Sequence, residues 1–384
     1  MAEKIARKPK NGPRIASATY RDVKEEIDDI DESSEVIPYR YSITYYGADY
    51  PVDGLVKRLN AHNIIVPTFD PETDGEGTVE GFQRHFLWEK TQCDRFVESL
   101  LLGLPVPEIF LAEQSNGRLL VLDGQQRLRT LQAFYKGALR GQEFILARVQ
   151  DEYRNRSYQT LDIRDRTRLD ESIIHATIVR QEEPSDDQGS IYLIFERLNS
   201  GGTTLHPQEI RVALYRGRFV KLLRELNERE SWRKLYGAKS HCLKDQELIL
   251  RFFALFYKGE NYQEPMKEFL NCFMGENKDL QRKSANELQD LFGKTCDVVL
   301  DCLGKKAFKL ESVVNAAVLD SIMVGVAKRL ESGGQVREKE RLREAHELLL
   351  RNDQYHDAVV RSTGDESKVK TRLRLAIDHF SKVS

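Results

Sequence analysis

The sequence lacks the features of membrane, secreted and zinc-binding proteins. Its 384 residues contain no apolar run of about 18 residues, the length that a transmembrane helix needs, and the polar, basic N-terminus has no apolar core of a secretory signal. The 5 cysteines are odd in number and scattered and form no C-x-x-C pair, so neither a disulfide framework nor a zinc site is indicated. We therefore expect a cytoplasmic protein without membrane association, with reduced and mostly buried thiols.

An excess of charge of one sign is also lacking. Lys and Arg number 59 against 61 for Asp and Glu, a formal net charge of −2 at pH 7, which argues against a protein whose whole surface binds nucleic acid. Charge is uneven near the N-terminus, where a basic stretch up to Arg14 precedes an acidic run over residues 24–32. Because such a segment has little apolar surface to bury, we expect residues 1–36 to form a solvated, flexible leader.

Several catalytic signatures are absent as well. The sequence has no G-x-x-x-x-G-K-[ST] phosphate loop, no G-x-S-x-G nucleophile turn and no H-E-x-x-H zinc helix. Its 8 histidines are dispersed, and the C-terminal third has no His and Asn cluster of the kind that an HNH nuclease needs around a divalent metal. The R-x4-H spacing of HEPN ribonucleases occurs at Arg351 and His356 and again at Arg341 and His346, but a chain rich in Arg produces such pairs by chance. These patterns therefore predict neither an HNH nor a HEPN nuclease centre in this chain.

The pattern of the sequence changes near residue 220. Residues 37–220 alternate short strand, turn and helix patterns, whereas residues 221–384 are dominated by amphipathic helices. Helices are predicted over 94–102, 218–226, 247–257, 285–292 and 337–350. We therefore predict an α+β fold in which a mixed domain over 37–220 is followed by an all-α domain over 221–384.

A strand, an Asp-Gly turn and a helix follow one another within the first half. Strands are predicted over 108–112 and 118–122, and the turn Ser115-Asn116-Gly117 between them is typical of a β-hairpin. Gly124 ends the second strand, and apolar residues at spacings of three predict a helix over 125–135.

The Asp123-Gly124 turn offers an anion site. The first backbone N–H groups of a helix have no intrahelical partner, and the helix dipole favours negative charge there. Gly124 permits a close approach of a ligand to the backbone, and Arg127 adds a permanent charge with donors suited to phosphate. Asp123 is suited to Mg²⁺, and Gln125 or Gln126 to holding an attacking water. Because an ordinary turn before a capped helix has the same pattern, the local signal leaves both interpretations open.

Three ordered sequence blocks resemble one known family. The central string VLDGQQRLRTLQAF is preceded by FQRHFLW at 82–88 and SLLLGLPVP at 99–107, and is followed by IFERLNSGGTTL at 194–205 and QEIR at 208–211. Together they are similar to the N-terminal domain of GmrSD-type restriction proteins, a member of the ParB and sulfiredoxin-like superfamily. The resemblance spans residues 40–220 and implies a ParB/sulfiredoxin-like, nucleotide-binding domain without a C-terminal HNH nuclease module.

The flanking blocks offer further ligands for this turn. Arg84 and Arg197 are candidate second and third positive charges on a triphosphate, and the turn after Asn199 is suited to present backbone donors to it. Trp88 is suited to stack on a base. The candidate cofactor-binding residues are thus Gln83, Arg84, Trp88, Gly124, Arg197, Asn199, Gly201 and Gly202.

Each of these assignments has an alternative. Trp88 also fits a place in the core, and Arg84 or Arg197 also fits an ion pair with a carboxylate such as Glu209. By the resemblance, Gln83 and Trp88 belong instead to a region that senses modified DNA.

The sequence also departs from the family pattern at two positions. Arg129 stands where Thr is typical, so that its charge faces phosphate, DNA or solvent, and His206 stands before Pro207 where a Ser cap is usual.

Our leading hypothesis is a Mg²⁺-dependent NTPase that regulates an antiphage or modification-dependent restriction system together with a separately encoded nuclease. Its catalytic residues are Asp123, Gln125, Gln126 and Arg127, with Asp123 as the metal ligand. The helical domain would contact DNA or the partner, and an oligomer is compatible with this role. The alternatives are a nucleotide-gated DNA-binding module without hydrolysis, and a ParB-like or HEPN-like nuclease acting by itself.

Overall fold

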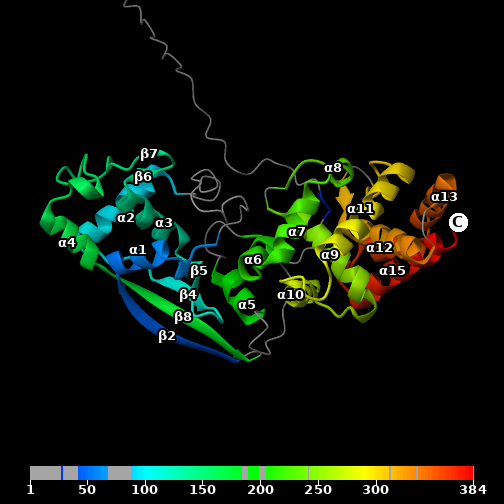
Figure 1. Cartoon of the computed structure of the whole chain (residues 1–384), viewed down its shortest axis with the longest axis horizontal. Coiled ribbons are helices and arrows are strands. Elements are labelled where there is room, and N and C mark those ends of the chain that lie inside the picture. Colours follow the sequence, from blue (N-terminus) through cyan, green and yellow to red (C-terminus); the bar gives the residue numbers. More distant parts are fainter. Residues whose placement is uncertain are drawn as a thin grey trace, which may run out of the picture.

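The protein is elongated, with a sheet in one half and helices in the other (Figure 1). The structure is a computed structural model, and it describes residues 27–28, 42–67, 88–183, 189–198, 205–240, 242–310, 313–333 and 336–383. In Figure 1 the blue-to-green sheet and its helices lie on the left, and the yellow-to-red helices lie on the right with the C-terminus at their far end. The α+β class with a helical second half, predicted from the sequence, is confirmed.

A mixed sheet, five-stranded within the described ranges, forms the first half. Its strands in sheet order are β2 (Ser42–Pro51), β8 (Ile173–Glu183), β4 (Ile109–Glu113), β5 (Leu119–Asp123) and β3 (Ile64–Ile65). Strand β4 runs antiparallel to β5 and parallel to β8, while β2 is antiparallel to β8. This order places the end of β5 at Asp123 beside Phe110 of β4, which in turn pairs with Thr177 of β8.

One face of the sheet is covered by helices that surround the Asp-Gly turn. These are α1 (Val52–Asn60), α2 (Lys90–Leu101), α3 (Gln125–Lys136) and α4 (Ile163–Glu171), with a small hairpin of β6 (Ala138–Leu139) and β7 (Gln142–Glu143) after α3. The apolar stripe of α3, Leu128, Leu131 and Phe134, is fully buried in the core that these helices share with the sheet. Packing therefore fixes the position of α3 on the sheet, and with it the position of the α3 N-terminus.

The opposite face of the sheet packs into the helical half. The elements there are α5 (Gly189–Leu198), α6 (Pro207–Leu214), α7 (Arg218–Asn227), α8 (Glu230–Tyr236), α9 (Lys244–Lys258), α10 (Met266–Asn277), α11 (Ala285–Cys302), α12 (Ala316–Gly333), α13 (Lys339–Leu350), α14 (Asp353–Val360) and α15 (Glu366–Ser381). Leu120 and Val179 of the sheet belong to the same buried cluster as the helices α9 and α12. The predicted boundary between residues 220 and 221 stays a prediction, and the packing across it is continuous. Within the predicted leader, β1 (Ile27–Asp28) pairs in parallel with β9 (Val314–Asn315).

Buried charged contacts join α5 and α6 to α9 and α10. Arg211 of α6 donates through Nη1 to Glu247 Oε2 of α9 over 2.8 Å and through Nε to Asn271 Oδ1 of α10 over 2.9 Å. Lys267 Nζ of α10 lies 2.8 Å from Glu196 Oε1 of α5. Since the side chains of Arg211 and Lys267 have no exposed surface, these contacts fix the register between α5, α6 and the helices behind them.

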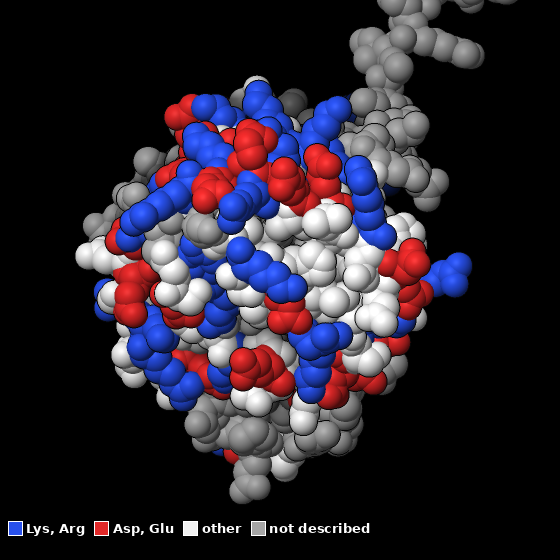
Figure 2. All heavy atoms as spheres, turned by 90° about the vertical axis from the view of Figure 1, so that its right-hand side faces the viewer, with Lys and Arg blue, Asp and Glu red and all other residues white. Residues whose placement is uncertain are grey.

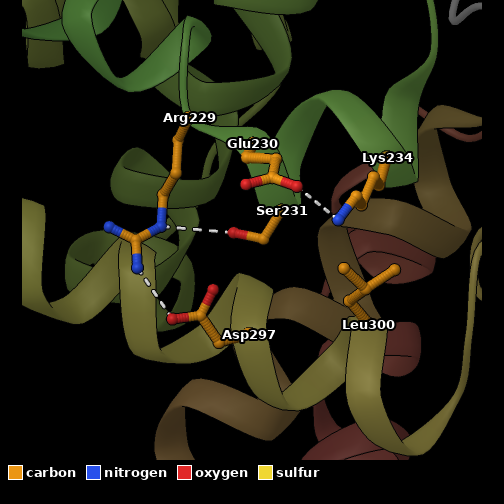
Figure 3. Close-up of a pocket in the computed structure, with 6 residues that line it drawn as sticks. All are labelled: Arg229, Glu230, Ser231, Lys234, Asp297 and Leu300. Carbon is orange, nitrogen blue, oxygen red and sulfur yellow. Dashed lines mark hydrogen bonds and ion pairs between the residues drawn. The ribbon is translucent and has the colours of Figure 1, made fainter.

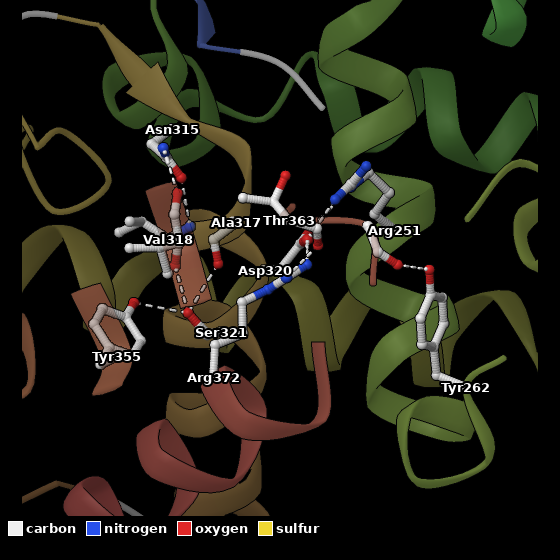
Figure 4. A network of polar contacts seen from close by, with 12 residues as sticks. Arg251, Tyr262, Asn315, Ala317, Val318, Asp320, Ser321, Tyr355, Thr363 and Arg372 are labelled. Atoms are coloured by element: carbon white, nitrogen blue, oxygen red, sulfur yellow. Dashed lines mark hydrogen bonds and ion pairs between the residues drawn. The ribbon is translucent and has the colours of Figure 1, made fainter. Parts of the chain in front are cut away.

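A second buried network lies inside the helical half (Figure 4). Asp320 of α12 accepts from Arg251 of α9 over 2.6 Å and from Arg372 of α15 over 3.1 Å. Arg372 Nη1 also donates to the carbonyl of Thr363 over 2.5 Å. One carboxylate thus binds two arginines, and none of the three side chains is exposed.

The outer end of the helical half carries mixed charge. Figure 2 looks onto this end and shows Lys and Arg interspersed with Asp and Glu rather than gathered by sign. The face displayed there is therefore not the large cationic surface that binding to nucleic-acid backbones favours. Within the described ranges, none of the helices combines the length and the apolar character that a bilayer span requires.

Most predicted elements are confirmed, with shifted ends. The hairpin of β4 and β5 and the helix α3 lie where the sequence predicts them, and the five cysteines, all within the described ranges, form no disulfide. Helix α2 begins at Lys90 rather than at residue 94, because Glu89 and Gln92 form a capping box before it. Helix α11 continues ten residues past the predicted end at residue 292, to Cys302.

Candidate functional site

The turn between β5 and α3 can be made only by glycine. Gly124 has φ +94°, in the left-handed region that other residues avoid. A Cβ atom at this position would lie 2.5 Å from Cγ2 of Ile109, which is fully buried on the neighbouring strand. The backbone of Gly124 therefore packs directly on β4, and the first turn of α3 starts immediately above the sheet.

The first turn of α3 starts without a side-chain cap. Among the described residues no side chain caps this helix, and its first turn contains no acidic residue. The first backbone N–H groups of a helix point out of its N-terminal end, and the helix dipole adds positive potential at the same point. This arrangement can receive an anionic group.

Arg127 holds Asp123 across the turn. Its Nη2 donates to Asp123 Oδ2 over 2.7 Å and to the carbonyl of Glu108 over 2.9 Å. The Arg127 side chain is 13% exposed and that of Asp123 is 44% exposed, so the guanidinium is packed inside while the carboxylate faces solvent. In this state Arg127 orients Asp123, and one carboxylate oxygen of Asp123 has no partner among the described residues.

The metal role of Asp123 stays a prediction. The described part of the chain contains no group of three or more His, Cys, Asp or Glu side chains arranged for a metal. A single half-exposed carboxylate is nevertheless a common protein ligand for Mg²⁺, which takes its other ligands from water and from nucleotide phosphates. A carboxylate with this exposure can bind a Mg²⁺ ion whose other ligands come from water and phosphate.

Gln126 and Trp88 meet beside the turn. Gln126 Oε1 accepts a hydrogen bond from the backbone N–H of Trp88 over 3.4 Å. The Trp88 ring is half-buried and packs against the core that α1 to α4 share with the sheet. It lies edge-on to the Phe96 ring, with 5.5 Å between the ring centroids. Trp88 thus has a place at the rim of the core, and its alternative role of stacking on a base stays a prediction. Gln125, the first residue of α3, is half-exposed.

The expectation for Arg129 is wrong. The side chain was expected to face phosphate, DNA or solvent, but it is 2% exposed and its Nη2 donates to the carbonyl of Pro67 over 2.8 Å. Burial lowers the pKa of its guanidinium to about 10. The first half of α3 is therefore enclosed on two sides, by the core and by the chain at Pro67.

The structure describes residues 194–198 and 205–211 of the sequence block that follows the central string. Arg197 is exposed near the end of α5, a helix that packs against β5, the strand that ends at Asp123. Glu209 of α6 is buried and accepts from the backbone N–H of His206 over 2.8 Å, so the capping box forms with His206 in place of the usual Ser. No ion pair to Glu209 is found within the described ranges. Gln83, Arg84, Asn199, Gly201 and Gly202 lie outside the described residues.

The family follows from a comparison of the sequence with family models. Residues 68–216 match the model of the GmrSD restriction endonuclease N-terminal domain. This chain carries a GmrSD N-terminal domain. The match lies inside the predicted span of residues 40–220 and includes the whole Asp123 to Arg127 turn. A search of curated proteins returns no match. Strands β2 and β3, which precede the matched residues, complete the sheet of the GmrSD domain.

Glu209 gives the GmrSD domain a pH-dependent stability. Burial raises the pKa of its carboxyl group to about 7. Because this lies above the value in the unfolded chain, the resulting stabilisation is complete at low pH and is lost as pH rises through 7. We expect the free energy of unfolding to fall by about 2 kcal/mol between pH 5 and pH 8 from this group, measured by urea unfolding.

The matched control for Glu209 is Glu287. Glu287 occupies the same capping position in α11 but is exposed. Glu209→Gln should remove most of this pH dependence, whereas Glu287→Gln should leave it in place. Equal pH profiles for the wild type and Glu209→Gln would contradict the assignment.

The Arg and His pairs of the second half do not resemble a nuclease centre. His346 is buried, with its Nε2 3.1 Å from the carbonyl of Ala307, and burial lowers its pKa. His356 is exposed on α14, and Arg351 lies 3.6 Å from Glu347 at the exposed end of α13. His346 thus has a buried backbone contact, and Arg351 has an exposed ion pair.

A cavity in the helical half is also a weaker candidate than the turn. It measures about 310 Å³ between α8 and α11 and is lined by Arg229, Glu230, Ser231, Lys234, Asp297 and Leu300 (Figure 3). Arg229 pairs with Asp297 over 2.7 Å, and Lys234 pairs with Glu230 over 2.5 Å. Since each cation there is neutralised by a carboxylate, the cavity offers no net charge to an anion.

Proposed function

We propose that the GmrSD domain binds a nucleoside triphosphate with Mg²⁺ at the Asp123 to Arg127 turn and hydrolyses it. The observation that carries this proposal is the glycine-enforced, uncapped start of α3 beside a half-exposed carboxylate. Backbone donors and the helix dipole favour phosphate at that point, and Asp123 supplies the metal ligand. In the cytoplasm such a domain would act as the regulatory component of a restriction system, with a separately encoded nuclease as partner.

In the proposed reaction a water molecule attacks the γ-phosphorus and the bond to the β–γ bridging oxygen breaks, which gives a nucleoside diphosphate and inorganic phosphate. Bound Mg²⁺ would neutralise charge on the phosphate oxygens. Asp123 would hold the metal or orient water, Arg127 would stabilise phosphate charge, and Gln125 would position the nucleophile. Arg84 and Arg197, with the turn of Asn199, Gly201 and Gly202, are proposed as further phosphate ligands.

The nucleotide state would be transmitted through α5 and α6. These helices belong to the matched domain, and they contact α9 and α10 through the buried pairs of Arg211 with Glu247 and Lys267 with Glu196. A shift of α5 or α6 would therefore move the helical half, which is proposed to contact DNA or the partner nuclease.

Phosphate release from ATP, GTP, CTP and UTP in the presence of Mg²⁺ tests this function. We expect Asp123→Asn to lower the rate at least tenfold, because it removes the metal ligand and the pair with Arg127. The matched control is Asp53→Asn, which breaks a similar pair of Asp and Lys four residues apart on the exposed side of α1. Absence of Mg²⁺-dependent release from the wild-type protein, alone and with added DNA, would reject hydrolysis.

A nucleotide-binding module without turnover is the second candidate. The observation in its favour is that Arg127 is packed inside and committed to Asp123, which leaves fewer free charges for a transition state. Calorimetry that finds tight nucleotide binding together with negligible phosphate release would select this candidate.

A further inference from the structure

Two side chains of α3 hold the backbone on either side of residues 68–87. Arg129 Nη2 donates to the carbonyl of Pro67 over 2.8 Å, and Gln126 Oε1 accepts from the N–H of Trp88 over 3.4 Å. Pro67 and Trp88 are the last described residue before that segment and the first after it. These two contacts, here termed the α3 clasp, connect Pro67 and Trp88 to one helix, although both residues are distant from α3 in the sequence.

Burial of the charged Arg129 side chain carries a large desolvation cost, and its hydrogen bond to Pro67 offsets part of that cost. A guanidinium that is 2% exposed has lost nearly all its hydration, and burial lowers its pKa to about 10. A buried charge persists only where hydrogen bonds compensate for that loss. Pro67, which is itself buried, supplies an acceptor through a backbone carbonyl, so the bond does not depend on the identity of the side chain at residue 67.

The clasp shares its helix turn with the proposed phosphate site. Gln126 is the second residue of α3, so its backbone N–H lies in the first turn while its side chain holds Trp88. Its carbonyl accepts from Thr130 Oγ1 over 2.8 Å, which links it to the buried turn that contains Arg129. A ligand that shifts this first turn therefore also displaces both ends of the clasp.

We propose that Gln126 and Arg129 are positioning residues that couple nucleotide binding at α3 to the placement of Pro67 and Trp88. This inference rests on the proposed nucleotide-binding function. It changes the role of Gln126, which then acts through Trp88 instead of holding the attacking water.

Tryptophan fluorescence gives a direct test. The chain has 2 tryptophans, half-buried Trp88 beside the turn and fully buried Trp232 in the helical half. Titration of the full chain with Mg²⁺ and a non-hydrolysable ATP or GTP analogue should change the emission of the wild type, and Trp88→Phe should abolish the change. Gln126→Leu and Arg129→Thr should reduce it at least fivefold, while Arg129→Lys, which keeps a donor, should retain part of it.

The same chain provides matched controls for the clasp. Gln132 lies on the same helix and donates to Asn60 over 2.9 Å, and Arg166 of α4 donates to the carbonyl of Gln159 over 2.7 Å. Gln132→Leu and Arg166→Thr remove the same groups from places away from the turn, and both should leave the nucleotide-dependent fluorescence change intact.

Steady-state kinetics separate positioning from catalysis. Clasp variants should raise KM at least fivefold with a smaller fall in kcat, whereas a water-holding Gln126 predicts a fall in kcat alone. If Arg129→Thr fails to fold, the half-exposed Gln126→Leu variant decides the question. Clasp variants that behave like the controls, while the wild type binds nucleotide, would overturn the coupling but leave the proposed function standing. A wild type that binds no nucleotide overturns both.

Discussion

Replacing Asp320 by alanine is expected to lower the free energy of unfolding by about 3–5 kcal/mol, because it leaves two buried arginines without their counter-charge. Asp320 accepts from Arg251 Nη2 over 2.6 Å and from Arg372 Nη2 over 3.1 Å, and none of the three side chains is exposed. The three residues come from α9, α12 and α15, so the loss would loosen the centre of the helical half (Figure 4). Urea unfolding followed by circular dichroism measures the effect.

An exposed ion pair of the same half provides the control for Asp320. Asp290 and Lys294 lie 3.3 Å apart on α11, and both side chains are about 70% exposed. Asp290→Ala should therefore change stability by less than about 1 kcal/mol. A similar small effect for Asp320→Ala would show that water or rearranged side chains replace the lost carboxylate.

The elements that the sequence predicted well are those set by neighbouring residues. The turn at Asn116-Gly117 specifies the hairpin of β4 and β5, and the apolar spacing of Leu128, Leu131 and Phe134 specifies α3. Both signals act within a few positions of the chain, so one sequence suffices to find them. The site at Asp123 lies between these two elements, and its main-chain geometry was predictable for the same reason.

Long-range contacts were not predictable from the same patterns. Strand β2 pairs with β8 along its whole length, but its residues are largely exposed and therefore show little of the alternation that marks a half-buried strand. Arg129 seemed exposed because arginine usually is, and its acceptor, the carbonyl of Pro67, has no sequence signal. The acceptor for Arg127, the carbonyl of Glu108, was missed for the same reason.

The contact between Asp123 and Arg127 also differs from what the sequence indicated. Asp123 and Arg127 were assigned as separate metal and phosphate ligands, yet they form one pair in the structure. Binding of Mg²⁺ and phosphate would have to compete with this pair, so Arg127 would move from Asp123 towards phosphate as the metal takes its place. If the proposed function holds, the pair is the resting state, and binding of Mg²⁺ and phosphate would separate Arg127 from Asp123.

Gly124→Ala is expected to abolish phosphate release, with a fall of at least about a hundredfold, because misplacing the start of α3 moves the phosphate donors. The added Cβ would lie 2.5 Å from Ile109 Cγ2, and φ is +94°. Left-handed strain and overpacking together should also lower the free energy of unfolding by about 2–5 kcal/mol. Activity is therefore compared at a temperature at which circular dichroism finds both proteins folded.

Gly117 separates backbone strain from steric conflict at Gly124. Gly117 in the hairpin turn also has a positive φ, +77°, but a Cβ there meets nothing within 4 Å. Gly117→Ala should therefore cost only the left-handed strain, about 1–2 kcal/mol, and keep phosphate release. In the Ile109→Ala background, where the obstructing methyl group is gone, Gly124→Ala should cost less stability than in the wild type. If the two substitutions are additive, the close packing of Gly124 on β4 is not what fixes the start of α3.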